Sequence, residues 1–93
     1  MSLPVFLTVS GSLRAGSFNT AILEHFAQFA SAKANVVRTD AVGQLPLYNQ
    51  DLDTDTPPAA VAAARAEIAA SDCVVAATPE YNYGIPGPLK NWF

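Results

Sequence analysis

The sequence lacks the cysteines and histidines on which many enzymes and small secreted domains depend. Cys73 is the only cysteine, so no disulfide framework can form within the chain, and a lone cysteine fits a cytoplasmic location. His25 is the only histidine, and we expect it at the surface, because no cysteine, aspartate or second histidine is spaced to join it. One histidine and one cysteine do not make a conventional catalytic triad, so we assign no catalytic side chain.

The chain also has few basic residues and no long apolar run. Five Lys and Arg residues stand against eight Asp and Glu residues, for a net charge of −3, and no basic cluster is present. Binding to a phosphate backbone needs a basic stripe, so nucleic acid is not an expected partner. The first residues do not have the pattern of a signal peptide, and no stretch approaches the ~20 apolar residues of a membrane helix, so no membrane partner is expected.

What the 93 residues do contain is 51% hydrophobic residues in alternating patterns. Short β-branched runs are typical of strands buried on both faces of a parallel sheet, and spacings of three and four residues are typical of helices. The alternation predicts a single α/β domain in which a doubly wound parallel sheet of order 2-1-3 lies between two layers of helices. The expected strands are residues 4–10, 34–38 and 72–78, and the expected helices are 17–32, 57–70 and one that begins at 89.

The same periodicities predict which side chains are buried. The sheet-facing stripe of the first helix is expected to consist of Ile22, Leu23, Phe26, Phe29 and Ala30. The run CVVAA, which begins at Cys73, is expected to be buried on both faces, with its thiol acting as a small hydrophobe.

The second helix is predicted from its capping residues and its alanines. Thr56 is expected to be its cap, because the prolines at 57–58 suit the first helical positions. The alanines favour helix but add little bulk, so Val61 and Ile68 are the expected anchors. The charged side chains of this helix, Arg65 and Glu67, are expected to face water.

A long polar connection over residues 40–56 carries Asp51, Asp53 and Asp55. Alternating carboxylates can form a divalent-metal loop, but an EF-hand needs a glycine after the third ligand and a distal glutamate. We therefore favour a solvated acidic loop and assign no metal ligands.

The loop between the first strand and the first helix, residues 10–19, reads SGSLRAGSFN and suits an anion. It places hydroxyl, guanidinium and amide groups at a helix start, where the first N–H groups lack intrahelical partners. These groups belong to Ser12, Arg14, Ser17 and Asn19. The loop matches neither the G-x-G-x-x-G fingerprint nor the P-loop. One interpretation is a phosphate site; the other is an N-cap at Ser17 with a solvated Arg14.

A second loop, residues 79–88, follows the third strand and reads PEYNYGIPGP. In a sheet of order 2-1-3, the carboxyl ends of the first and third strands flank the topological switch point, so the two loops are expected to meet. A rigid, tyrosine-rich loop can offer aromatic faces and backbone groups to a flat heterocycle. The two loops together suit a planar ligand that carries a phosphate, such as FMN; the alternative is a proline-rich turn whose tyrosines pack on the core.

These motifs, GSLRAGSFN at 11–19, PEYNYGIPG at 79–87 and LKN at 89–91, resemble those of the NADPH-dependent FMN reductase family, which includes chromate and quinone reductases. The segment LPLYNQDL at 45–52 is also similar to that family. The resemblance implies a flavodoxin-like fold, with residues 1–93 as its N-terminal part. Two departures are Gly84, where serine is frequent, and the ending Trp92-Phe93, where the family usually continues differently.

The resemblance also implies a site and an activity. The phosphate and ribityl chain of FMN would be surrounded by Ser12, Arg14, Ser17, Phe18 and Asn19, and the isoalloxazine would be lined by Pro79, Glu80, Tyr81, Asn82, Tyr83 and Gly84. NADPH or NADH would be the reductant, a quinone, chromate or similar small molecule the acceptor, and a homodimer or homotetramer the assembly. The alternatives are a flavodoxin-type electron carrier and an inactive truncated paralogue.

Family members carry two more strands with their helices, so we expect these 93 residues to be a fragment or a truncated product. The third strand would then lack its next neighbour. An unpaired hydrophobic edge is an aggregation or strand-swapping hazard.

Overall fold

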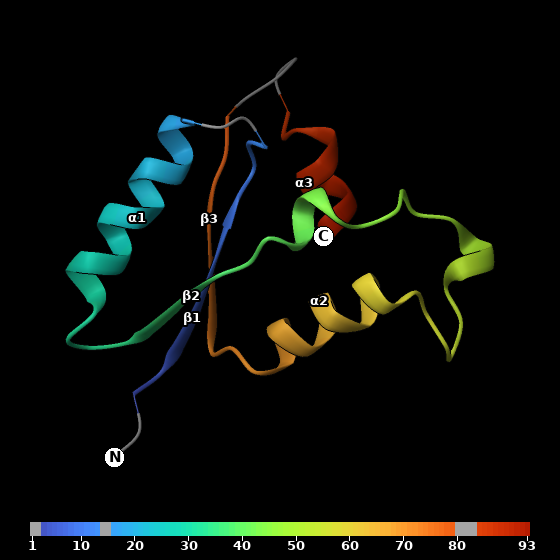
Figure 1. Ribbon diagram of the computed structural model, residues 1–93, viewed down its shortest axis with the longest axis horizontal. Coiled ribbons are helices and arrows are strands. Elements are labelled where there is room, and N and C mark those ends of the chain that lie inside the picture. Colours follow the sequence, from blue (N-terminus) through green and yellow to red (C-terminus); the bar gives the residue numbers. More distant parts are fainter. Residues whose placement is uncertain (1–2, 14–15, 80–83) are drawn as a thin grey trace.

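Three parallel strands form a sheet with one helix on one face and two helices on the other (Figure 1). The computed structural model describes residues 3–13, 16–79 and 84–93. Each predicted strand and helix is present within a few residues of its expected ends. In chain order the elements are β1 (Val5–Ser10), α1 (Phe18–Ala30), β2 (Asn35–Arg38), the 3-10 turns η1 (Ala41–Gly43) and η2 (Gln50–Leu52), α2 (Ala59–Ala69), β3 (Cys73–Ala77) and α3 (Gly87–Trp92).

The central strand of the sheet is β1, and the order β2-β1-β3 confirms the predicted 2-1-3. Both pairings are parallel, with Val5 in register with Asn35 of β2 and Phe6 with Cys73 of β3. The carboxyl ends of β1 and β3 therefore lie at one edge of the sheet, at the top of Figure 1, where α1 also begins. This edge is the predicted switch point.

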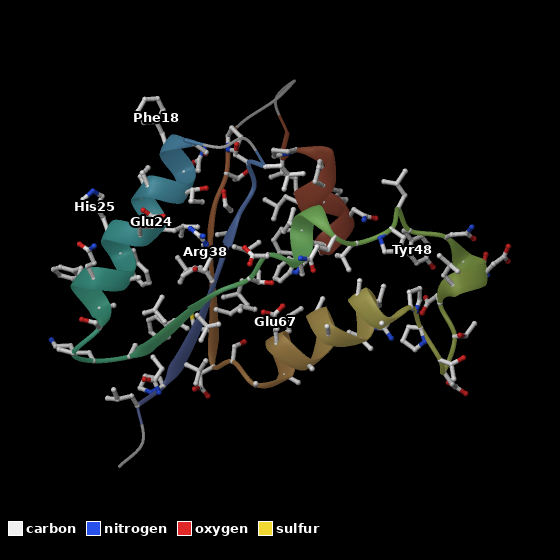
Figure 2. The ribbon with its side chains drawn as sticks, in the orientation of Figure 1. Phe18, Glu24, His25, Arg38, Tyr48 and Glu67 are labelled. Atoms are coloured by element: carbon white, nitrogen blue, oxygen red, sulfur yellow. The ribbon has the colours of Figure 1, made fainter. Side chains whose placement is uncertain are left out.

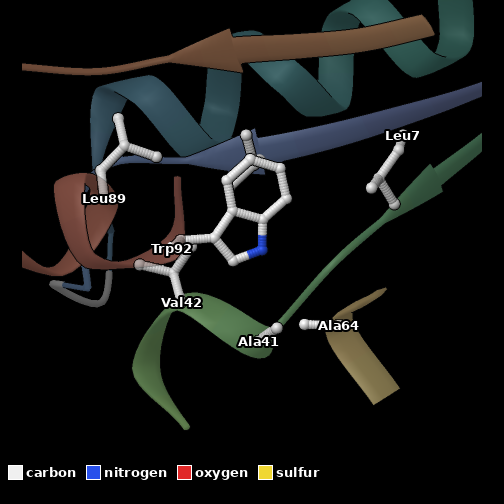
Figure 3. Close-up of a cluster of buried hydrophobic side chains, with 7 residues drawn as sticks. Leu7, Ala41, Val42, Ala64, Leu89 and Trp92 are labelled. Atoms are coloured by element: carbon white, nitrogen blue, oxygen red, sulfur yellow. The ribbon is translucent and has the colours of Figure 1, made fainter. Parts of the chain in front are cut away.

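The main hydrophobic core lies on the α2 and α3 side of the sheet. Leu7 and Val9 of β1 point to this side and are fully buried, because alternate strand residues face opposite ways. The rest of the core consists of Ala41, Val42, Ala64, Leu89 and Trp92 (Figure 3). On the opposite face, Phe6 stacks on Phe26 of α1 with ring centroids 6.2 Å apart.

The first part of the connection after β2 is buried, whereas its aspartates Asp51, Asp53 and Asp55 are exposed, as predicted for a solvated acidic loop. Ala41 and Val42 of η1 are buried in the core, where they supply bulk that the alanine-rich α2 does not. The buried Thr39 hydroxyl donates to Glu67 Oε1 at 2.6 Å and accepts from the Ala41 N–H at 3.1 Å. The expectation that Glu67 faces only water is therefore wrong, because its carboxylate holds η1 against α2.

Two predictions for α2 are also wrong. The N-cap position is Pro58 and has no side-chain cap, so Thr56 does not cap the helix. Ala64 is the buried residue of α2, whereas Val61 is half-buried and Ile68 is exposed. The small Ala64 side chain lets the helix backbone approach η1 closely, so contact is made there rather than at the larger Ile68. Arg65 is exposed, as predicted.

The α1 helix buries a narrower stripe than its apolar residues predict. Leu23 is buried, and Phe26 and Ala30 are half-buried. Ile22 and Phe29 are 59% and 91% exposed, so their predicted contact with the sheet is wrong. The physical reason is angular, because at ~100° per residue Ile22 lies a quarter-turn or more from Leu23 and outside the arc that meets the strands.

The predicted burial of β3 on both faces is wrong as well. Cys73 and Val74 are exposed, and Val75 is half-buried. The reason is position, because β3 is an edge strand that pairs only with β1 among the described residues. The Cys73 thiol is thus not a buried hydrophobe. No helix in the described part of the chain has the length and apolarity needed to cross a bilayer.

Candidate functional site

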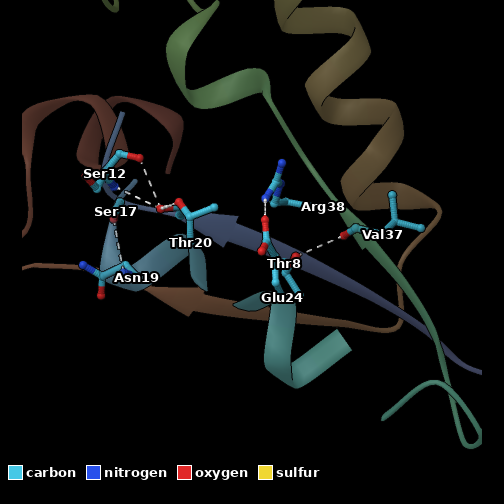
Figure 4. Close-up of polar contacts among 9 residues, drawn as sticks. Thr8, Ser12, Ser17, Asn19, Thr20, Glu24, Val37 and Arg38 are labelled. Carbon is cyan, nitrogen blue, oxygen red and sulfur yellow. Dashed lines mark hydrogen bonds and ion pairs between the residues drawn. The ribbon is translucent and has the colours of Figure 1, made fainter. Parts of the chain in front are cut away.

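A hydroxyl network shapes the loop that leaves β1. Ser10 Oγ accepts from the Ser12 N–H and from the Thr20 hydroxyl, each at 3.2 Å, and can donate to the Ser12 carbonyl oxygen at 3.2 Å (Figure 4). The network joins the last residue of β1 to the first turn of α1. Residues 10–13 are therefore held across the start of the helix, with Ser12 half-buried.

Ser17 forms the N-cap of α1. Its Oγ accepts from the Asn19 N–H at 3.2 Å, and the side chain is buried. Gly16 before it has φ of +73°, a conformation that side-chain-bearing residues rarely adopt. An accepting serine oxygen can still donate its own proton, so the cap and an anion-binding role are compatible. The prediction that Ser17 is an N-cap is therefore confirmed.

The start of the first loop is in direct contact with the end of β3. The Gly11 N–H donates to the carbonyl oxygen of Ala77, the last paired residue of β3, at 2.8 Å. A Cβ on Gly11 would lie 2.7 Å from Thr78 Cβ and 3.1 Å from Leu89 Cδ2, so only glycine fits without displacing its neighbours. The first loop therefore lies against the end of β3 and Thr78, one residue before the predicted second loop.

The other predicted residues differ in how far they are buried. Asn19 is half-buried in the first turn of α1, while Phe18 is 80% exposed and its ring points away from the sheet (Figure 2). Pro79 is half-buried next to Thr78, and Gly84 is exposed before α3. Five predicted residues lie outside the described part of the chain: Arg14, Glu80, Tyr81, Asn82 and Tyr83.

Sequence reasoning missed three residues that position this edge. Ser10 and Thr20 hold the first loop, and Thr78 packs against Gly11. A signal was available for Ser10, since a serine at a strand end commonly bonds a backbone group two residues on. Nothing in the sequence alone pairs Thr20 with Ser10, because that contact depends on where α1 settles over β1.

The hollows of the described structure lie beside this edge rather than over it. A cavity of about 300 Å³ opens between α2, α3 and residues 45–53. Its wall includes Trp92, whose buried Nε1 has no hydrogen-bond partner in the described structure. A second hollow of about 200 Å³ touches Ser12 on the β2 side, next to Arg38. The contacts of Gly11, Ser12 and Thr78 form the floor of the switch point.

Elsewhere in the described part of the chain, the ionisable groups do not form a reactive cluster. Asp51, Asp53 and Asp55 are exposed, and Asp53 pairs with Arg65 at 3.5 Å and accepts from the Tyr48 hydroxyl at 3.3 Å. Among the described residues, no three His, Cys, Asp or Glu side chains are grouped to hold a metal ion. His25 is exposed on α1, as predicted.

Comparison with known proteins places this arrangement among flavin-dependent reductases. The chain is 44% identical over 86 residues to the probable NADPH:quinone oxidoreductase 2 of Oryza sativa, covering 89% of this chain and 42% of that protein. It is 41% identical to the quinone reductase of Escherichia coli, covering 91% and 46%. It is 42% identical to an NAD(P)H-dependent FMN reductase of Pseudomonas aeruginosa, covering 91% and 45%.

The fold is also that of a solved flavoenzyme. FerB, an NAD(P)H:(acceptor) oxidoreductase from Paracoccus denitrificans, matches with a TM-score of 0.88 and 34% identity, over 97% of this chain and 48% of FerB. The chain thus spans about half the length of the relatives it matches. The pattern that defines NADPH-dependent FMN reductases matches residues 4–93. The chain therefore belongs to the NADPH-dependent FMN reductase family.

Proposed function

We propose that the chain binds FMN at the edge where β1 and β3 end, as part of an NAD(P)H-dependent reductase of small quinones. The contact between Gly11 and residues 77–78 is the observation that carries this proposal. It holds the start of the hydroxyl-rich loop against Thr78, which directly precedes the tyrosine-rich segment, at a topological switch point. Such switch points are where open α/β sheets bind ligands. The names of the relatives, quinone reductases from plants and bacteria, support this acceptor class.

The described residues fit the phosphate of FMN. The hydroxyls of Ser12 and Ser17 can donate hydrogen bonds to a phosphate. They lie at the N-terminus of α1, which attracts negative charge. Asn19 and Phe18 stand beside them at the helix start, and Arg14 would add a positive charge. Pro79 and Gly84 begin and end the segment proposed to line the isoalloxazine, together with Glu80, Tyr81, Asn82 and Tyr83.

The chemistry that bound FMN supplies is hydride transfer from NADPH or NADH and delivery of two electrons to an acceptor. A quinone acceptor takes up two electrons and two protons and is released as the hydroquinone. The role of this chain's residues is to hold the phosphate, orient the ring and limit water at the switch point, and no side chain is assigned as acid or base. A cytoplasmic location and self-association remain part of the proposal, the former supported by the lone cysteine.

FMN binding is tested by the visible spectrum of the 93-residue protein after incubation with FMN and desalting. Retained flavin absorbance is expected. Turnover is then measured as NADPH consumption with a small benzoquinone. Oxidation of NADPH that depends on the quinone supports a reductase. Bound flavin without turnover would indicate an electron carrier instead, and a colourless protein would overturn the proposed site.

The role of Ser17 is tested by Ser17→Gly. Glycine is a tolerated N-cap that costs only a few tenths of a kcal/mol, so unfolding should change little. Losing a hydroxyl that bonds a charged phosphate costs about 1.5–3 kcal/mol, so the FMN Kd should rise about tenfold or more. Ser31→Ala, at the far end of α1, is the matched control and should leave the Kd unchanged. An unchanged Kd for Ser17→Gly would leave Ser17 as a helix cap only.

A further inference from the structure

A hollow lies on the β2 side of the loop that leaves β1. It measures about 200 Å³, and the residues that line it lie between Ser10 and Gly43. They come from the loop after β1, from the first turn of α1 and from the connection after β2. We call it the β2-side hollow. The proposed isoalloxazine segment follows β3, on the other side of β1, so this hollow faces a part of the ligand other than the ring.

Arg38 supplies a positive charge to the β2-side hollow. It ends β2, and its register with Thr8 places its side chain on the α1 face of the sheet. Its Nη1 pairs with Glu24 Oε1 at 3.2 Å, and its other guanidinium nitrogens bond to none of the described residues (Figure 4). Because the arginine fork matches the oxygens of a phosphate, Arg38 can bind one while it keeps its contact with Glu24.

Asp40 and Thr20 add hydrogen-bond acceptors to the same hollow. Asp40 is at the N-cap position of η1, yet its side chain makes no cap bond and no ion pair with the described residues. The Thr20 hydroxyl donates to Ser10 Oγ at 3.2 Å, so its oxygen can only accept from a ligand. Sugar hydroxyls donate to acceptors of this kind. One cation and two acceptors in a single hollow therefore match a ribose that carries a phosphate.

A second hollow, between α1 and β2, adjoins the first at Arg38 and Asp40, which line both. It measures about 390 Å³. One of its walls is apolar and consists of Leu23, Ala27 and Val36, which suits the face of a flat heterocycle. Together the two hollows reach the ~300–1,000 Å³ of small-molecule sites. They offer an apolar wall for a base, acceptors for a ribose and a guanidinium for a phosphate, which are the parts of an adenylate.

We infer that these two hollows bind the adenylate half of FAD, so that the chain accepts FAD as well as FMN. This binding rests on the proposed function, because it starts from a flavin phosphate held at Ser12 and Ser17. The flavin ring extends from that phosphate toward β3, and an adenylate joined to the phosphate extends toward β2. The second phosphate then meets Arg38, the ribose meets Asp40 and Thr20, and the adenine lies on the apolar wall.

The charges around the hollows predict how strongly the adenylate is held. Arg38 is one cation beside two carboxylates, Glu24 and Asp40, so AMP alone is expected to bind weakly. In FAD, the flavin half holds the adenylate next to the hollows, which makes the second contact intramolecular. The FAD Kd is therefore expected within about tenfold of the FMN Kd, with contacts to Arg38 and Asp40 that FMN does not make.

The test compares the Kd of FMN with the Kd of FAD by equilibrium dialysis of the 93-residue chain. Arg38→Gln and Asp40→Ala should each raise the FAD Kd about fivefold, because a solvent-exposed polar contact is lost, and should leave the FMN Kd unchanged. Glu24→Gln should lower the FAD Kd about twofold, because it releases Arg38 to the phosphate. Arg65→Gln removes a similarly exposed ion pair with Asp53 and is the matched control, which should change neither Kd. Circular dichroism checks that the variants remain folded.

A loss of affinity for FAD alone in Arg38→Gln and Asp40→Ala supports this site. A chain that binds FMN and rejects FAD overturns it, as does a ratio of the two Kd values that these variants leave unchanged. If Arg38→Gln instead raises the KM for NADPH at an unchanged ratio, the hollows hold the adenylate of the reductant and the assignment to FAD is wrong. A chain that binds neither flavin refutes the proposed function itself, so the FMN Kd distinguishes the two failures.

Discussion

Gly11 is the residue on which the geometry of the two loops depends most. A Cβ there would lie 2.7 Å from Thr78 Cβ, closer than real atoms approach. We expect Gly11→Ala to lower the free energy of unfolding by about 1–3 kcal/mol, because overpacking forces the loops apart. Gly87→Ala is the control, since nothing lies within 4 Å of its Cβ position. Urea denaturation measures both, and equal stability of the two variants would contradict this role.

At the scale of single residues, the sequence predicts local roles such as helix capping better than it predicts contacts between residues far apart in the chain. Ser17 is recognisable as a cap because capping is local, and the structure has that cap. The contact of Gly11 with Thr78 joins residues far apart in the chain, and no local pattern encodes it. The burial of Thr39 and its bond to Glu67 belong to the same class of long-range contact. The sequence therefore identifies side chains that can cap a helix or bind a ligand, but it does not identify the distant residues that hold the loops in place.

One hydroxyl links the start of η1 to α2, in addition to the packing of Ala64 near η1. Thr39 donates to Glu67 and accepts from the Ala41 N–H, and both bonds are lost in Thr39→Val. The Ala41 N–H would then lack its acceptor in a buried position, so we expect unfolding free energy to fall by about 1–3 kcal/mol. Glu67→Gln keeps an acceptor oxygen and should cost clearly less. If the two variants lose equal stability in thermal unfolding, the charge of Glu67, and not the hydroxyl network, holds the elements together.

The strands and α-helices were predictable in number and order, but the 3-10 turns η1 and η2 were not, and neither was the set of residues that each element buries. The periodicity of α1 is strong enough to predict a helix, yet five apolar residues cover a wider arc than three strands can meet. Ile22 and Phe29 consequently lie in solvent. The strand CVVAA has the composition of a central strand but sits at an edge, so its exposure follows from topology and not from its own residues.

At the scale of the whole molecule, strand order and loop position follow from general rules of α/β folds. Parallel strands joined by helices place every carboxyl end at one edge, so the position of the ends of β1 and β3 side by side could be predicted from the sequence alone. The unequal burial on the two faces of the sheet could not be predicted from the sequence. Most of the buried core lies under α2 and α3, while α1 covers its face mainly through Leu23 and Phe26.

This asymmetry predicts how the molecule unfolds. Trp92 is the only tryptophan, and it packs from α3 into the same core as Leu7 and Val9 of the central strand. Its fluorescence should therefore change at the same urea concentration as the far-ultraviolet circular dichroism signal, as expected for a single cooperative transition. Fluorescence of free N-acetyltryptophanamide in the same urea series corrects for the solvent effect. A tryptophan transition at clearly lower urea would mean that α3 detaches first, and that the floor of the switch point, where Leu89 lies against Gly11, opens before the sheet does.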